Sequence, residues 1–197
     1  MIAKTVSVAL LALTLIAQAP VAQAARDDEN RGLSSVTRVK SAGVSQAALA
    51  KKAEDPEIIR AALKEAVVEV TKATPRNRRI WCVPFARAVT GIELKGNAVT
   101  WWKQAADRYQ RGSQPKIGAI MNFRSTRKMP MGHLAVVSHV LDERRILIDQ
   151  ANWVRNRITE DTLVVDISAA NDWSQVRVEN TAGTLGAPYP VFGFIYK

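Results

Sequence analysis

The stretch that decides the fold runs from residue 117 to residue 152 and reads IGAIMNFRSTRKMPMGHLAVVSHVLDERRILIDQAN. Within it, the segments Ile117–Phe123, Gly132–Leu141 and Arg145–Asn152 are each short, rich in Val or Ile, and separated by turn residues or charge. This pattern predicts three consecutive strands. Two later apolar segments, Val176–Val178 and Val191–Tyr196, are expected to add further strands.

Helical patterns precede these strands. An amphipathic helix is expected over residues 55–75, because Asp55 is a good N-cap and Pro56 suits the first helical position. A short helix is expected over Cys82–Thr90, ending at Gly91, and another from Asn97 to about residue 109. Helices followed by an antiparallel sheet predict the α+β class.

The first residues predict export. Lys4 precedes an apolar run that is too short to span a bilayer, and Ala22-Gln23-Ala24 provides a small-x-small cleavage site. We therefore expect a signal peptide over residues 1–24, a flexible linker over 25–54 and a catalytic domain over 76–197. The location is then periplasmic or secreted from a bacterial cell, and the alternative is an uncleaved membrane anchor.

The chain is strongly basic. It has 28 Lys and Arg against 18 Asp and Glu, so its formal charge of +10 becomes +9 when Lys4 leaves with the signal peptide. Such an excess favours binding to polyanions, which outside the cytoplasm are cell-wall polymers or anionic lipid rather than nucleic acid. The helix over residues 55–75 is expected to pack on the domain, with a partner-binding helix as the alternative, and we expect a monomer without a further membrane span.

The chemistry-bearing residues are few. The chain has one cysteine, Cys82, and two histidines, so it can form no internal disulfide and offers no zinc-like spacing. Cys82 is expected in the first turn of its helix, where the helix dipole stabilises a thiolate, and His133 opens a strand. The pair is compatible with nucleophile and base, although a lone Cys is also a common buried residue.

Five pieces that surround this pair occur in a recognisable order. They are Trp81–Arg87 (WCVPFAR), Gly96–Trp102 (GNAVTWW), Pro115–Ile120 (PKIGAI), Gly132–Val137 (GHLAVV) and Gln150–Trp153 (QANW). Together they resemble the CHAP family of cysteine, histidine-dependent amidohydrolases and peptidases. The resemblance covers about residues 78–155.

The resemblance implies a papain-like α+β domain in which the helix bearing Cys82 packs on an antiparallel sheet bearing His133. It also implies hydrolysis of amide bonds in bacterial peptidoglycan, either between muramic acid and L-alanine or within the peptide stems. Cys82 matches the nucleophile and His133 the general base. Gln150 falls at the third polar position, where many members have Glu, and Asn152 matches a polar residue two further on.

Strand alternation supports Gln150 as the residue that orients His133. Ile148, Gln150 and Asn152 share one face of the expected strand, whereas Asp149 faces the other side. His139 is expected to be structural, because it lies roughly 20 Å along the strand from His133.

Aromatic and basic residues flank the expected site. Trp81, Trp101, Trp102 and Trp153 are candidates for a substrate cleft, although we expect at least two of them in the core. The basic segment Arg76–Arg79 either steers an anionic substrate or is a solvated loop.

The mechanism expected from sequence starts from a Cys82–His133 ion pair and proceeds through a thioester, without a metal or cofactor. Two other functions are compatible with the same residues. One is an amidase for a small amide outside the wall, and the other is a non-catalytic wall-binding module in which Cys82 only packs.

Overall fold

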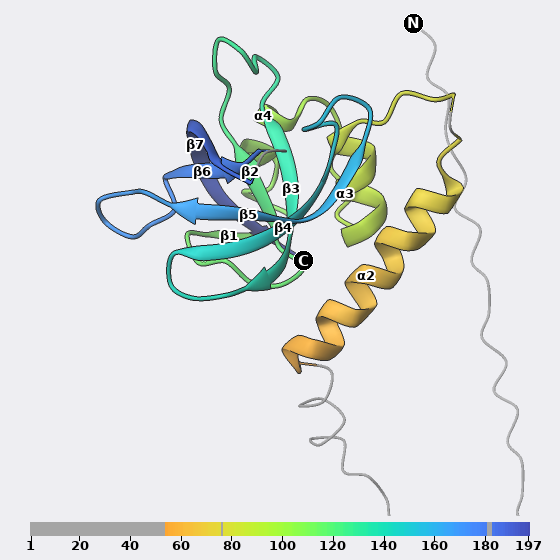
Figure 1. Cartoon of the computed structure of the whole chain (residues 1–197), viewed down its shortest axis with the longest axis horizontal. Helices are drawn as coiled ribbons and strands as arrows, with labels where there is room; N and C mark the ends of the chain where they lie inside the picture. The colour runs from red at the N-terminus through yellow and green to blue at the C-terminus, as the bar shows by residue number, and fades with distance from the viewer. Residues whose placement is uncertain (1–53, 76, 181–182) are drawn as a thin grey trace, which may run out of the picture. The chain divides into compact units, whose positions relative to one another are not determined.

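A computed structural model describes residues 54–75, 77–180 and 183–197 (Figure 1). The expected signal peptide over 1–24 lies outside these residues, as does the expected linker apart from Glu54. In the described part, no helix is both long and apolar enough to cross a membrane.

Three helices come first along the described chain. Helix α2 spans Pro56–Ala73, and the Asp55 side chain caps it by accepting the backbone N–H of Glu57 at 2.9 Å. Helix α3 spans Cys82–Thr90 and ends at Gly91, whose φ of 69° is left-handed. Helix α4 spans Ala98–Gln104, so it is shorter than expected, and turns occupy the residues up to Tyr109.

Seven strands follow within the described residues, and all of their pairings are antiparallel. They are β1 (Gln110–Gly112), β2 (Ile120–Phe123), β3 (His133–Val140), β4 (Arg145–Ala151), β5 (Ile158–Asp166), β6 (Gln175–Glu179) and β7 (Leu185–Tyr196). The order along the sheet is β1-β7-β2-β3-β4-β5-β6, and β7 also pairs with β6. Strands β2 to β7 therefore close into a six-stranded barrel, and β1 extends it by pairing with β7.

The closed barrel shows that the expected papain-like α+β fold is wrong. The protein is mostly β, and its sheet is a barrel rather than an open layer under a helix. Strand β5 was not predicted, because its sequence, ITEDTLVVD, is interrupted by polar residues. Closure also depends on the amino-terminal half of β7, which contains Pro188 and Pro190 and pairs with β6. Proline argues against a strand in sequence-based reasoning, so this long-range pairing had no local signal.

Two apolar clusters lie on opposite faces of the barrel wall. Alternating residues of the strands form the interior cluster. Ala135 and Val137 of β3 belong to it, together with residues from each of the other five barrel strands. Their neighbours Leu134 and Val136 face outward and pack with residues of the three helices. The helices thus cover one side of the barrel, and they position the amino terminus of α3 beside the start of β3.

Candidate active site

Cys82 is the first residue of α3. Trp81 precedes it in extended conformation and makes no side-chain cap, so the first backbone N–H groups of the helix point toward the thiol without a competing cap. The buried residues Phe85 and Ala86 hold α3 in the outer cluster. The half-buried thiol consequently sits at the positive end of a helix that the core fixes in place.

His133 is the first residue of β3 and is 5% exposed. Gly132 brings the chain to this position with φ 69°, and a Cβ there would lie 2.9 Å from both the Phe123 carbonyl oxygen and the Val99 nitrogen. Only glycine allows the chain at position 132 to lie this close to the backbones of both β2 and α4. The imidazole packs against two aromatic rings, with centroid distances of 5.6 Å to Phe123 and 5.1 Å to Trp153.

Gln150 contacts His133, as strand alternation indicated. Its Oε1 lies 3.0 Å from Nε2 of His133, and the residue is fully buried in β4, opposite Ala135. When the amide oxygen accepts, the imidazole proton is held on Nε2, so Nδ1 is the nitrogen that can accept a proton. The Gln150 Nε2 atom has no hydrogen-bond partner among the described residues.

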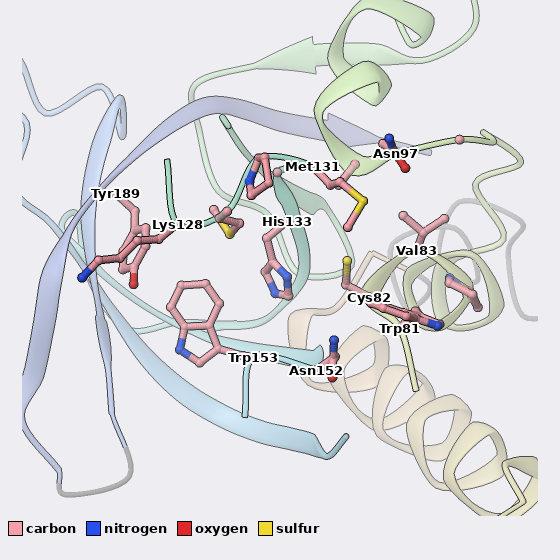
Figure 2. Close-up of a pocket in the computed structure, with 16 residues that line it drawn as sticks. Trp81, Cys82, Val83, Asn97, Lys128, Met131, His133, Asn152, Trp153 and Tyr189 are labelled. Carbon is pink, nitrogen blue, oxygen red and sulfur yellow. The ribbon is translucent and has the colours of Figure 1, made fainter. Parts of the chain in front are cut away.

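Asn152 follows β4 in the left-handed conformation, with φ 64°. Its Oδ1 accepts the backbone N–H of Asn156 at 2.8 Å, which fixes the side chain and leaves the amide nitrogen for other contacts. Figure 2 shows this nitrogen directed toward Cys82. Asn152 therefore joins the same cleft without contacting His133 through a hydrogen bond.

Asp149 faces away from His133, toward α2. Its carboxylate accepts Lys64 Nζ at 2.8 and 3.0 Å and the Asp161 backbone N–H at 2.8 Å. His139 lies further along β3 and does not line the cleft. Neither residue belongs to the arrangement around Cys82.

The four tryptophans divide between core and cleft. Trp101 is fully buried, and Trp102 packs against the outer cluster and stacks on Phe192. Trp153 lines the cleft, and so does Trp81, which is 42% exposed. Of the basic segment, Arg79 stacks on the Trp81 ring at 4.9 Å, whereas Arg76 lies outside the described residues.

Cys82 and His133 share a cleft of about 680 Å³ (Figure 2), in which the thiol is directed toward the imidazole. Several lining residues had not been predicted, namely Asn97, Lys128, Met129, Met131 and Tyr189. The residues from 128 to 131 precede His133 in sequence, so proximity along the chain was a usable signal. Tyr189 had none, because it reaches the cleft through closure of the barrel by β7.

Burial sets the protonation of the pair. It lowers the pKa of His133 to about 4, although the Gln150 hydrogen bond acts in the opposite direction. Burial also raises the pKa of the Cys82 thiol, although a backbone hydrogen bond from Leu134 opposes this. Both shifts favour a neutral thiol beside a neutral imidazole, in contrast to the ion pair expected from sequence.

Within the described ranges, no group of three or more His, Cys, Asp and Glu side chains is placed to hold a metal ion. The site is thus a thiol at a helix terminus, an imidazole with its free Nδ1, and a buried amide that holds the imidazole. Such an arrangement is suited to covalent catalysis by a cysteine.

The family comparison agrees with this class of site. The CHAP domain model matches residues 74–152, a range that includes Cys82, His133, Gln150 and Asn152, and the resemblance predicted from sequence is confirmed. CHAP domains are generally hydrolases, amidases or peptidases, and they are associated with peptidoglycan. No curated protein shows a significant match to the chain.

Proposed function

We propose that this protein is an exported cysteine amidohydrolase or peptidase that hydrolyses amide bonds of bacterial peptidoglycan. The bond is either the muramoyl–alanine amide or an amide within the stem peptides. One observation carries the proposal. Within the CHAP-matched segment, His133 is held by Gln150 at 3.0 Å in the same cleft as the only cysteine.

In the proposed reaction, Cys82 Sγ attacks the scissile carbonyl carbon while Nδ1 of His133 takes the thiol proton. The tetrahedral intermediate collapses to a thioester as the imidazolium returns that proton to the leaving amine. Water then attacks the thioester, again giving a proton to Nδ1, and the thiol is restored when the acid product leaves.

Because the resting pair is neutral, thiolate formation accompanies attack instead of preceding it. The attack therefore depends on the correct imidazole tautomer, which Gln150 supplies by accepting Nε2–H. A neutral amide suffices, since no permanent imidazolium has to be balanced.

The oxyanion of the intermediate needs hydrogen-bond donors. We assign it to the backbone N–H of Cys82, which starts α3, and to the amide nitrogen of Asn152. The bond from Asn156 to Asn152 Oδ1 supports this role, because it orients the amide so that nitrogen faces the cleft.

Export is part of the proposal and is supported by Lys4, the apolar run after it and Ala22-Gln23-Ala24. The positive charge suits an anionic cell-wall polymer. Intact-mass measurement of the extracytoplasmic protein is expected to give Ala25 as the first residue and, under native conditions, a monomer. Full-length protein in the cytoplasm would contradict the location.

A non-catalytic wall-binding module is the second candidate. The raised pKa of the Cys82 thiol favours it, because a protonated thiol is a poor nucleophile. The hydrogen bond between His133 and the Gln150 amide favours catalysis instead. It fixes the imidazole tautomer and leaves Nδ1 free to accept a proton, and a histidine that only fills space in the core needs neither.

The function is tested by digesting purified sacculi and identifying the muropeptides by mass spectrometry. A muramoyl–alanine amidase releases whole stem peptides, an endopeptidase releases shortened stems or opened cross-links, and a binding module releases nothing. A small synthetic amide that is cleaved while sacculi stay intact would indicate the non-wall amidase.

A further inference from the structure

Among the described residues that line the cleft, one charged side chain is not used by the reaction. Of the described side chains that line it, Lys128 alone is charged near neutral pH, because His133 is held neutral by burial. Apart from Cys82 and His133, the other lining residues are aromatic, aliphatic, thioether, amide or glycine. An anionic group of a bound substrate thus finds a single complementary charge in this cleft.

Lys128 has no carboxylate partner within the described part of the chain. The Tyr189 hydroxyl likewise has no hydrogen-bond partner among the described residues. Figure 2 shows the two side chains at the same end of the cleft, with Trp153 between them and Cys82. The Lys128 ammonium and the Tyr189 hydroxyl are therefore a suitable pair of hydrogen-bond donors for a carboxylate.

The backbone holds Lys128 at this rim. Thr126 and Met129 close a tight turn around it through two backbone hydrogen bonds of 3.1 and 3.0 Å. The Met131 carbonyl oxygen accepts the Val99 N–H at 2.9 Å, so the same loop is tied to α4. The loop is thereby placed at a fixed position relative to His133, which reduces the entropic cost of using Lys128 in binding.

We propose that Lys128, assisted by the Tyr189 hydroxyl, binds a carboxylate of the substrate at the end of the cleft opposite Cys82. The preferred substrates are therefore anionic peptides with a free carboxylate at a residue neighbouring the scissile amide. This inference rests on the proposed function, and it specifies which stems are cleaved. In a peptidoglycan stem the carboxylate is that of the D-glutamyl residue or of the carboxyl terminus.

The test uses a synthetic muramoyl peptide that contains both candidate bonds, N-acetylmuramoyl-L-alanyl-γ-D-glutamyl-L-lysyl-D-alanine. It is compared with two forms in which the D-glutamyl or the terminal carboxylate is a carboxamide. Binding is measured by calorimetry with Cys82→Ala, which prevents turnover, and cleavage by steady-state kinetics with otherwise unaltered protein. One of the two carboxamides is expected to bind about 10-fold more weakly, as is typical for loss of one charge-assisted hydrogen bond.

Lys128→Met is expected to raise KM about 10-fold for the carboxylate peptide with little change in kcat. It should also abolish the preference for the carboxylate peptide over the carboxamide form that binds more weakly to the unaltered cleft. Lys128→Arg should retain most of the preference. Arg127→Met is the matched control, since Arg127 lies in the same loop but does not line the cleft, and it should change neither value.

The inference is overturned if both carboxamides bind as well as the carboxylate peptide, or if Arg127→Met and Lys128→Met have equal effects. Failure of the proposed function is distinguishable, because in that case no peptide is cleaved while the binding preference in the Cys82→Ala background is still measured.

Discussion

Lys64→Met tests how helix α2 is joined to the barrel. Lys64 of α2 donates to Asp149 of β4, whose side chain is fully buried, whereas the Lys64 side chain is 23% exposed. Burial acts to lower the pKa of Lys64, but its hydrogen bonds to Asp149 and Asp161 outweigh this and raise it. Burial also raises the pKa of Asp149, against the effect of Lys64, so the carboxylate depends on its partner.

The expected loss follows from these contacts. Removing one partner of a fully buried ion pair typically costs about 3–5 kcal/mol. Here the Asp161 backbone N–H remains as a donor to Asp149, and Lys64 is partly hydrated in the native protein. We therefore expect Lys64→Met to lower the free energy of unfolding by about 2–3 kcal/mol, or Tm by roughly 4–12 °C.

The loss should depend on pH in a defined direction. Without Lys64, the pKa of Asp149 in the folded protein rises further above its unfolded value of about 4. The folded protein then holds a proton that the unfolded chain has released, so stability falls as pH rises from about 4 through the raised pKa. The difference between wild type and Lys64→Met should consequently be larger at pH 8 than at pH 5.

Urea denaturation followed by tryptophan fluorescence measures the difference at both pH values. Glu160→Gln is the control, because Glu160 also contacts Lys64 but its side chain is 45% exposed, and it should cost less than about 1 kcal/mol. The reasoning is refuted if Lys64→Met unfolds at the wild-type midpoint, or if its loss is the same at pH 5 and pH 8.

Three further results are expected. Activity should fall as pH drops through about 4, where the imidazole of His133 becomes protonated and cannot accept the thiol proton. Gln150→Glu should raise the pKa of His133 and move the acid limb of the pH–rate profile to higher pH, and an unmoved limb would contradict the assigned contact. Gln150→Ala should reduce kcat about 10- to 1,000-fold, less than loss of Cys82, and wild-type kcat in this variant would reassign the third residue. Gly132→Ala should cost about 2–4 kcal/mol in urea denaturation, because its φ strains a residue with a Cβ and its backbone contacts leave no room for one. Gly118→Ala, with similar φ but open space, should lose less, and equal losses would contradict the steric account.

Local patterns predicted much of the site. The caps and glycines around α2 and α3 placed Cys82 at a helix start, and alternation along β4 separated Gln150 from Asp149. These features depend on residues close together in sequence, where periodicity and turn chemistry act directly.

The parts that were not predicted depend on distant pairings. Barrel closure needs β7 to pair with both β2 and β6, and the prolines in β7 concealed its first half. The same closure brings Tyr189 to the cleft. Burial of His133 against Phe123 and Trp153 is also a tertiary effect, and the lowered pKa of the imidazole favours a neutral pair over the ion pair expected from sequence.

The central claim is that Cys82 performs amide hydrolysis on peptidoglycan. The most direct measurement compares wild type with Cys82→Ala, at equal Tm, for the release of new amino groups from purified sacculi. Wild type is expected to release amines continuously, and Cys82→Ala is expected to release none above the background without protein. Equal release by the two proteins, or none by wild type, would contradict the claim.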